Sequence, residues 1–186
     1  TTIVIRTIGE RTTDLCYQLV KMQVIEKNIF VINEIPFHQA VRRTFELGLK
    51  NDKPWTIAVD ADVLLRRNAI KDLVAEAENC SHQFFKGNAK AYDKFLGKTR
   101  YLPPHIYSTK YLQQAVENLP NYFGLRPETE VRNIMKDKLG IQQAYFPMVV
   151  AVHDFEQYYA DIYRKSFVFG FKHLKRIKQY ISFWAA

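Results

Sequence analysis

Short apolar runs alternate with amphipathic stretches along the first part of the chain, up to about residue 80. Three of these runs, Ile3–Arg6, Asn28–Asn33 and Trp55–Val59, have the length and composition of buried strands. Between them, apolar residues recur three or four positions apart, as they do on the inner face of a helix. This repeated strand–helix alternation predicts an α/β fold with a mostly parallel central sheet and helices on both of its faces.

Residues that typically begin helices support this pattern. Pro36 fits the first turn of the helix after the second strand, and Asn68 can cap the helix after the third. The second half of the chain is less regular. There we expect a loop over Gly87–Pro104, a helix from Pro127 to a stop at Gly140, a strand over Pro147–Val152, and a helical stripe from Phe155 to Tyr163.

Positive charge is concentrated at the C-terminal end of the chain. The net charge is +8, and residues 162–186 contain six Lys or Arg residues and no acidic residue. The rest of the chain is nearly balanced, which argues against a nucleic-acid surface over the whole protein. The aromatic and basic residues of this segment would suit an anionic membrane surface. They would equally suit a segment packed on the domain with its lysines in water, and the sequence leaves both interpretations open.

Cysteine usage and hydropathy bear on the compartment. Cys16 and Cys80 form no recognisable disulfide or zinc pattern and are typical of reduced thiols. No apolar stretch approaches the roughly 18 residues that indicate a membrane-spanning helix. With 186 residues, the chain has the length of one domain. We therefore expect a cytoplasmic protein, with contact at the membrane periphery through its basic C-terminal segment in the first of those two interpretations.

The third apolar run ends in two carboxylates, Asp60 and Asp62, which are one residue apart. Side chains alternate along a strand, so the two carboxylates point the same way wherever extended geometry persists. Like charges at the end of a buried strand repel each other unless a cation lies between them and a ligand. Mg²⁺ and Mn²⁺ prefer such oxygens and often complete their shells with substrate phosphates. The alternative is a plain turn in which Asp60 ends the strand and Asp62 is solvated.

Polar clusters follow all three predicted strands. Arg6–Arg11 comes after the first, Asn33 and Glu34 after the second, and Asp60–Asp62 after the third. In parallel sheets with helices on both faces, ligands bind at the carboxyl ends of the strands. The sequence therefore predicts that these three clusters converge on one edge and form a binding site there.

This order of motifs resembles the nucleotide-sugar-dependent glycosyltransferases of the GT-A fold, which is Rossmann-like, and in particular their family-two type. The likeness rests on the polar loop after the first strand, the polar pair after the second, the Ala40-Val41-Arg42-Arg43 helix, and the Asp-x-Asp (DXD) motif of Asp60-Ala61-Asp62. The segment from Thr2 to about Leu65 carries most of it. His153 follows a later apolar run, at the place where family members often supply one more metal ligand.

The resemblance implies a division of the single domain, residues 1–186, into three parts. Residues from 1 to about 80 would bind the nucleotide, and those from about 81 to 163 would hold the acceptor and the metal. A basic, aromatic C-terminal helix would cover about 164–186.

The resemblance also implies roles for individual residues. Mn²⁺ or Mg²⁺ would be bound by Asp60, Asp62 and His153. Glu128 and Glu130 would be candidates for the general base of an inverting enzyme, although glutamate in the first turn of a helix is also favoured by the helix dipole. The residues expected to bind the donor nucleotide are Arg6, Thr7, Glu10, Arg11, Asn33, Arg42 and Asp60.

The implied reaction moves a sugar from a nucleoside-diphosphate sugar to a hydroxyl of a glycan or a lipid-linked acceptor, in glycan or polysaccharide biosynthesis. Two alternatives come from other classes. The first is a non-catalytic GT-A-like binding module that docks on a membrane or a partner through its basic tail. The second is a nucleotidyltransferase, which is disfavoured because the loop after the first strand contains Gly9 as its only glycine.

Overall fold

The computed structural model describes residues 1–119 and 126–172, apart from the side chains of Phe169 and Lys172. Within these residues, seven strands form one sheet: β1 (Thr2–Arg6), β2 (Ile29–Ile32), β3 (Trp55–Asp60), β4 (Val63–Leu65), β5 (Phe84–Asp93), β6 (Lys98–Ser108) and β7 (Gln142–His153). Their order across the sheet is β2-β1-β3-β6-β5-β7-β4.

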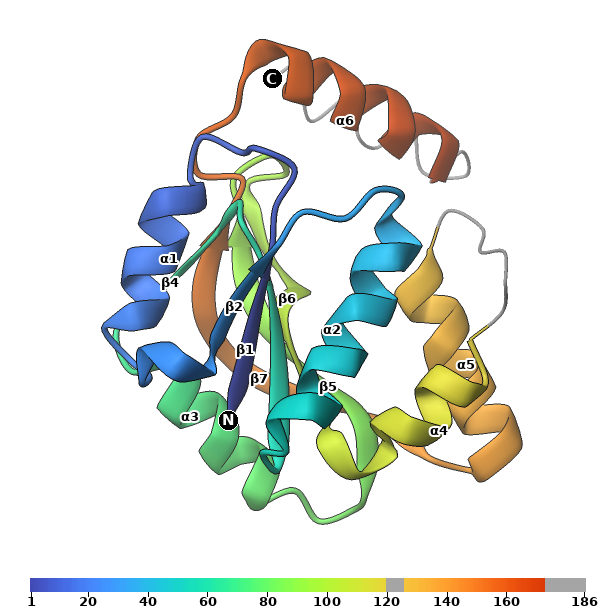
Figure 1. Cartoon of the computed structure of the whole chain (residues 1–186). Coiled ribbons are helices and arrows are strands. Elements are labelled where there is room, and N and C mark those ends of the chain that lie inside the picture. Colours follow the sequence, from blue (N-terminus) through green and yellow to red (C-terminus); the bar gives the residue numbers. More distant parts are fainter. Residues whose placement is uncertain (120–125, 173–186) are drawn as a thin grey trace.

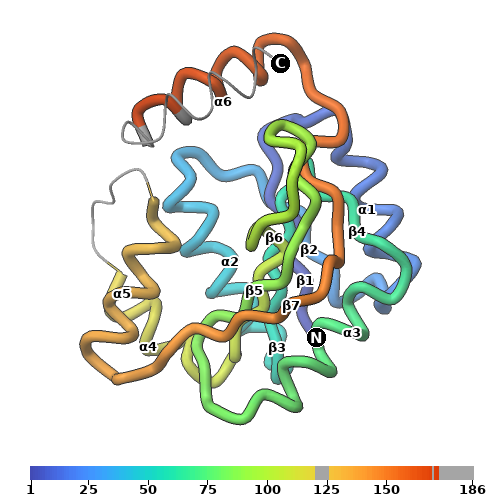
Figure 2. Tube along the Cα trace, turned by 180° about the vertical axis from the view of Figure 1, so that it is seen from behind, coloured from blue at the N-terminus to red at the C-terminus, as the bar shows by residue number. Residues whose placement is uncertain are grey.

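Helices cover both faces of this sheet. They are α1 (Thr13–Lys21), α2 (Phe37–Asn51), α3 (Ala69–Glu78), α4 (Leu112–Glu117), α5 (Pro127–Leu139) and α6 (Tyr159–Lys172), with short 3₁₀ turns at Glu26–Asn28 and Thr109–Tyr111. Helices α1 and α3 pack on one face, and α2, α4 and α5 pack on the other (Figure 1). Helix α6 lies apart from both layers, across the end of the sheet where β1 and β7 finish (Figures 1 and 2).

The strand directions confirm the α/β fold class. Strands β1, β2, β3, β5 and β7 run in one direction, and β4 and β6 run against them. The antiparallel pairs all lie in the half of the sheet built from β6 onwards. This difference arises because short connections join β5 to β6 and β3 to β4, whereas helices connect the parallel strands of the first half.

The sheet is curled. Strands β3 and β4 are separated along the chain by Ala61 and Asp62 alone, yet β3 pairs with β1 and β6 whereas β4 pairs with β7 at the edge. A backbone hydrogen bond joins the two parts of the sheet, since the amide of Asp154, just after β7, donates to the carbonyl of Asp62 at 3.0 Å. The edge strand and the middle of the sheet therefore meet at Asp62.

The core follows from the apolar pattern of the sequence. Every residue of β1 is buried, and Ile57 and Val59 of β3 pack with it beneath α1 and α3. On the other face, Phe45 of α2 and Tyr107 of β6 have their ring centroids 5.1 Å apart, in an edge-to-face contact. Removing these apolar surfaces from water is what holds the two helix layers on the sheet.

The expected loop over Gly87–Pro104 is wrong, because this segment forms most of the β5–β6 hairpin. The glycine marks a close approach, since a Cβ at Gly87 would lie 2.6 Å from Cε2 of Phe146. The prolines Pro103 and Pro104 lie where the β5–β6 register shifts, between the pairs Asn88–His105 and Lys90–Tyr101, so no regular ladder bond is lost there.

The other boundaries are partly as expected. Helix α5 starts at Pro127 and ends before Gly140, whose φ of +67° is left-handed, so both predicted ends are confirmed. Asn68 precedes α3 but makes no capping hydrogen bond through its side chain. The C-terminal helix begins at Tyr159 rather than near residue 164, so Phe155 and Tyr158 precede it, and residues 173–186 of the expected helix lie outside the described residues.

Candidate functional site

The strands that run in the common direction end at one edge of the sheet, and four of them, β1, β3, β5 and β7, end in a polar residue there. Arg6 and Asp60 are register partners at the ends of β1 and β3, and Asp93 and His153 are partners at the ends of β5 and β7. The structure therefore brings together side chains from four separate segments. Ligands of open α/β sheets bind at this same edge.

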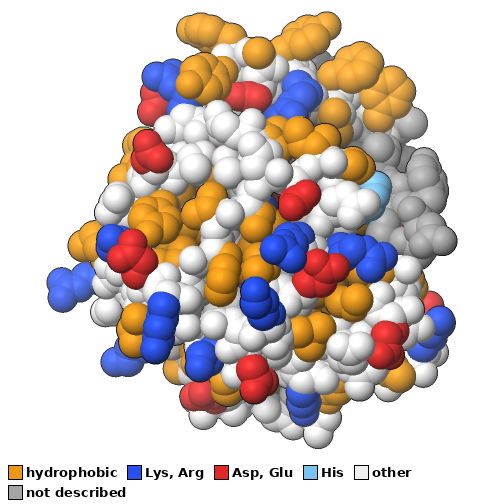
Figure 3. Space-filling view, in the orientation of Figure 1, with side chains coloured by type: hydrophobic (Ala, Val, Ile, Leu, Met, Phe, Trp, Pro, Cys, Tyr) orange, Lys and Arg blue, Asp and Glu red, His pale blue; other side chains and the backbone are white. Residues whose placement is uncertain are grey.

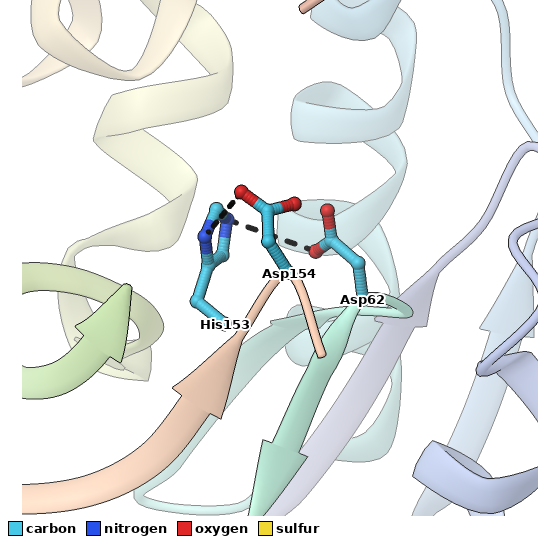
Figure 4. A group of neighbouring side chains, drawn as sticks. All are labelled: Asp62, His153 and Asp154. Atoms are coloured by element: carbon cyan, nitrogen blue, oxygen red, sulfur yellow. Dashed lines mark ion pairs between the residues drawn. The ribbon is translucent and has the colours of Figure 1, made fainter. Parts of the chain in front are cut away.

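His153 and two carboxylates that lie beside these strand ends form a group that could hold a metal ion: Asp62, His153 and Asp154. One ligand atom from each residue lies within 4.8 Å of the others. Figure 4 shows the imidazole and the two carboxylates turned toward one another, with His153 at the end of β7, Asp154 directly after it and Asp62 beside them. We call these three residues the metal group.

Distances within the metal group are short. Nδ1 of His153 lies 3.0 Å from Oδ2 of Asp154, and Nε2 lies 3.8 Å from Oδ1 of Asp62. The backbone of Asp154 has a φ of +58°, which few non-glycine residues adopt. Asp154 is thus held in an uncommon conformation at the point where it faces the other two ligands.

Electrostatics at the metal group follow from burial and proximity. Burial alone would lower the pKa of His153, but Asp154, Asp93 and Asp62 together raise that pKa to about 10. Burial would raise the pKa of Asp154, but His153 and Lys165 hold it well below its usual range. The ring is therefore an imidazolium in this arrangement and must lose its proton before a metal can bind to it.

The metal group fits a hard divalent cation. Two carboxylates and one imidazole are ligands that Mn²⁺ accepts and that Mg²⁺ accepts in part. Asp62 is 6% exposed, and its Oδ1 atom is buried without a hydrogen bond to any described residue. An unsatisfied buried carboxylate oxygen is costly, and binding to a cation would remove that cost.

Lys165 of α6 contacts both carboxylates of the metal group. Its Nζ lies 2.5 Å from Oδ2 of Asp62 and makes a second ion pair with Oδ1 of Asp154. Burial would lower the pKa of Lys165, but the two carboxylates raise it above its ordinary value. A positive charge from the protein itself is therefore present beside the ligands.

Two adjoining cavities open at this edge among the described residues. One, of about 330 Å³, is lined by Arg6, Thr7, Glu10, Glu34 and Phe37 among others. The other, of about 400 Å³, is lined by Asp93, Arg100, His153, Asp154 and Lys165 among others. Both include Asp60, Asp62 and Arg164 in their walls.

A second group of charged side chains lies deeper, under the first cavity. We call it the buried cluster: Arg6, Lys86, His105 and Glu128. The carboxylate of Glu128 lies 2.7 Å from Nη1 of Arg6 and 3.1 Å from both Nζ of Lys86 and Nε2 of His105. It also accepts a hydrogen bond of 2.9 Å from the hydroxyl of Tyr107.

Arg6 links the buried cluster to the Asp-x-Asp motif. Its Nε donates to Oδ1 of Asp60 at 2.8 Å, and its guanidinium lies 4.9 Å above the ring of Phe37. Burial would lower the pKa of Arg6, but Asp60 and Glu128 raise it further above its usual range. Asp60 is therefore engaged by Arg6, and it stands outside the metal group although the sequence predicts a metal ligand there.

The remaining donor-binding predictions divide into two sets. Thr7 and Glu10 line the first cavity, but Glu10 also accepts hydrogen bonds from Oγ1 of Thr7 and the amide of Ile8, both at 2.8 Å, and so shapes the loop. The other three residues, Arg11, Asn33 and Arg42, do not line either cavity. Arg11 instead pairs with Glu156 at 2.8 Å.

Glu128 and Glu130 lie in the first turn of α5, and neither lines either cavity. Burial would raise the pKa of Glu128, but Lys86, His105 and Arg6 hold it well below its usual range. A carboxylate with so low a pKa is a weak proton acceptor. The base role of both residues stays a prediction, and the surroundings of Glu128 argue against it.

Sequence reasoning missed Asp93, Asp154 and Lys165 at this site. Asp154 had a readable signal, because it directly follows His153 at the end of an apolar run. Asp93 was hidden inside the segment taken for a loop. Lys165 looked like one of several basic residues of the tail, and only the position of α6 shows which residues it contacts.

The comparisons with known proteins place the fold. Neither the protein-family models nor the curated proteins contain a match to this sequence. Solved structures do resemble it. A glycosyltransferase involved in glycosylation of the major capsid of PBCV-1 is 10% identical with a TM-score of 0.59, over 87% of this chain and 95% of that one.

Two further structures are similar over most of the chain. Glucosyl-3-phosphoglycerate synthase from Mycobacterium tuberculosis, in complex with Mn²⁺, UDP and phosphoglyceric acid, is 12% identical with a TM-score of 0.52, over 97% of this chain and 76% of that one. CMP:2-keto-3-deoxy-manno-octonic acid synthetase, complexed with CTP, is 11% identical with a TM-score of 0.50, over 81% and 90%. At such identities the likeness concerns the fold, and this chain has the Rossmann-like α/β fold of GT-A glycosyltransferases and nucleotidyltransferases.

Proposed function

We propose that this protein is a metal-dependent glycosyltransferase that moves a sugar from a nucleoside-diphosphate sugar to a hydroxyl acceptor in glycan or polysaccharide biosynthesis. One observation carries the proposal. The metal group lies where two cavities adjoin, and the two cavities share Asp60, Asp62 and Arg164. A donor of this class has a nucleoside and a sugar on either side of a diphosphate, which matches two cavities on either side of a cation site.

The described residues suggest how a donor would lie. The first cavity would take the nucleoside between Phe37 and the loop that contains Thr7, and the second would take the sugar beside Asp93 and Arg100. Asp62, His153 and Asp154 would hold Mn²⁺ or Mg²⁺, which neutralises charge on a leaving diphosphate when bound. Arg6 would hold the carboxylate of Asp60 in place at the donor site through their ion pair.

The test is thermal unfolding with UDP, GDP, CDP and their sugar conjugates, each with and without Mn²⁺. A ligand at about 100 times its dissociation constant stabilises the folded state by about 2.7 kcal/mol. We expect one nucleotide to raise the melting temperature only with Mn²⁺, and Asp62→Ala to abolish that rise. Asp137→Ala, which removes an exposed carboxylate of α5, is the matched control and should keep it.

Three results would contradict all or part of the proposal. No rise with any nucleotide would remove the donor site, and a rise that persists in Asp62→Ala would place the cation elsewhere. A nucleotide that binds equally well without metal would be consistent with the fold but would contradict the metal dependence.

We also propose that a lipid-linked acceptor is reached through α6 at an anionic phospholipid bilayer. Tyr159, Tyr163, Phe167 and Phe171 recur every four residues, and each is at least 60% exposed. Figure 3 shows hydrophobic side chains gathered along the top of the molecule, over α6. Beyond Arg164 and Lys165, which line the cavities, the sequence continues with four basic residues (Lys172, Lys175, Arg176 and Lys178) and no acidic one, a composition that suits an anionic surface.

Vesicle co-sedimentation tests the bilayer as the partner of this face. The protein should bind vesicles that contain phosphatidylglycerol but not vesicles of phosphatidylcholine alone, and Tyr163→Ser with Phe167→Ser should abolish binding. Met22→Ser with Ile25→Ser removes two exposed apolar side chains elsewhere and is the control. Equal binding by both double variants would contradict the proposal. Among the described residues, no helix has the length and hydropathy needed to cross a membrane.

A further inference from the structure

Helix α6 presents two different faces. Its outer face carries the exposed aromatic residues, whereas Arg164, Lys165 and Val168 line the cavities beneath it. Lys165 reaches furthest, since its ammonium contacts Asp62 and Asp154 at the same time. This ammonium is a positive charge of the protein itself that bridges the two carboxylates of the metal group.

A divalent cation and this ammonium would compete for the carboxylates of the metal group. Mg²⁺ and Mn²⁺ bind carboxylate oxygens at about 2.0–2.2 Å, and they draw ligating oxygens around themselves. The ammonium already lies 2.5 Å from Oδ2 of Asp62 and contacts Oδ1 of Asp154. The two cations would share the same two carboxylates and repel each other at short range, so the binding of one opposes the binding of the other.

A diphosphate bound in the adjoining cavities would be a new partner for the displaced ammonium. Lysine carries its charge on a flexible four-carbon stem, so the head can move while the helix stays in place. Lys165 lines the second cavity, and Arg164, its neighbour, lines both. A diphosphate bound at the wall that the cavities share would lie within reach of both side chains and would carry the opposite charge.

We propose that Lys165 exchanges partners during donor binding: it leaves Asp62 and Asp154 when the divalent cation enters, and then binds the diphosphate of the donor. The proposal rests on the proposed function for the identity of the donor, but its first half concerns the cation alone. Lys165 is then a binding residue for the diphosphate and a competitor of the free metal. These two roles predict opposite effects of one substitution.

The first experiment measures the affinity of the protein for Mn²⁺ alone, without nucleotide. Electron paramagnetic resonance reports the concentration of the free ion. We expect Lys165→Ala to bind Mn²⁺ about tenfold more tightly than wild type, an ordinary size for the coupling between two sites. Lys165→Arg keeps a positive charge and should bind Mn²⁺ as weakly as wild type. Lys71→Ala removes an exposed lysine of α3, remote from the metal group, and should change nothing.

The second experiment measures the affinity of the protein for inorganic pyrophosphate by calorimetry at saturating Mg²⁺. Here we expect Lys165→Ala to bind about tenfold more weakly than wild type, as after loss of one charge-assisted contact. Lys165→Arg should retain binding, and Lys71→Ala should match wild type. Thermal unfolding of each variant verifies that it is folded, and Lys165→Met, which keeps the apolar stem, replaces the alanine variant if that variant is unfolded.

The outcomes separate the exchange from the proposed function. An unchanged or weaker Mn²⁺ affinity in Lys165→Ala overturns the competition. Tighter Mn²⁺ with unchanged pyrophosphate overturns the transfer of Lys165 to the diphosphate. If both effects appear but no nucleoside diphosphate binds, the exchange stands and the proposed function fails.

Discussion

The buried cluster and the metal group with Lys165 are both sets of paired charges, but they are closed in different ways. In the buried cluster, each partner of Glu128 is fixed in the sheet, and the side chains are 4–14% exposed. At the metal group, Lys165 comes from a helix outside the sheet and is 26% exposed. Both carboxylate oxygens of Glu128 accept hydrogen bonds, although Nδ1 of His105 makes none, whereas Oδ1 of Asp62 has no hydrogen-bond partner among the described residues.

The same fold thus uses carboxylates for two purposes. A carboxylate whose partners are all rigid contributes to stability and gains nothing from a ligand. A carboxylate with one mobile partner can exchange that partner for a ligand. Whether a carboxylate stabilises the fold or binds a ligand therefore depends on whether its charged partner can move away.

The strongest test of the contrast is Glu128→Gln. Removing this charge leaves Arg6 and Lys86 buried with one counter-ion fewer, which typically costs about 3–5 kcal/mol. Urea denaturation should show a loss of this size, while Glu76→Gln, at an exposed position of α3, should show almost none. Unchanged stability together with lost turnover would instead support the predicted base role of Glu128.

Acid should destabilise the buried cluster next. Burial and Lys86 lower the pKa of His105 below its ordinary 6.5, and the cations around Glu128 hold its pKa well below 4.5. The unfolded chain therefore takes up protons first as the pH falls below about 6.5 for the histidine and about 4.5 for the glutamate. Stability should fall with pH by about 1.4 kcal/mol per unit for each proton.

Denaturation curves at successive pH values measure this slope. His105→Gln has no titrating group at this position, so its stability should be flatter than that of wild type between about pH 6.5 and pH 4.5. An identical slope in the variant would show that other groups cause the acid sensitivity.

Asp62→Asn should have a much smaller effect on stability than Glu128→Gln. Lys165 keeps Asp154 as a partner, and ion pairs with a partly exposed member contribute at most about 1 kcal/mol. Denaturation in the absence of metal is the measurement. A loss as large as that of Glu128→Gln would show that the metal group is structural and would remove the contrast.

The reactivity of the two thiols tests the contrast with the smallest expected effect, because one thiol is buried beneath the site and the other is partly exposed. Cys16 lies below the site with its Sγ 3.9 Å from the carbonyl of Asp60, and burial together with Asp60 and Asp62 raises its pKa to about 12. Because the thiolate is the reactive form, an aromatic disulfide reagent at neutral pH should label Cys80 and leave Cys16 unreacted. Denaturant should expose both, and rapid labelling of native Cys16 would contradict a sealed core beneath the site.

Much of the fold could be predicted because the first half of the sequence is locally consistent. Each of its strands is a compact apolar run, and helices with clear periodicity connect them. The β5–β6 hairpin could not be found this way, since Gly87, Pro103 and Pro104 are breakers in isolation. Their strand conformation depends on the close approach of Phe146 and on a register shift, which are tertiary facts.

Part of the candidate site could be predicted from the sequence in the same way. Asp62 and His153 follow apolar runs, and the structure brings them within 3.8 Å of each other. The engagement of Asp60 by Arg6 and of Glu128 by Lys86 could not be read from the sequence, because those partners are distant along the chain. Carboxylates at strand and helix ends look alike until their neighbours are known.

The curl of the sheet gives the cation site a mechanical consequence. About half of the chain lies between Asp62 and His153, and the edge strand β4 starts immediately after Asp62. An ion bound by both residues would act as a cross-link that fastens the free edge of the sheet to its middle, and cross-links over long loops restrict the unfolded chain the most. Metal loading should therefore slow amide exchange along β4 and the end of β7, where the rolled sheet would otherwise open first.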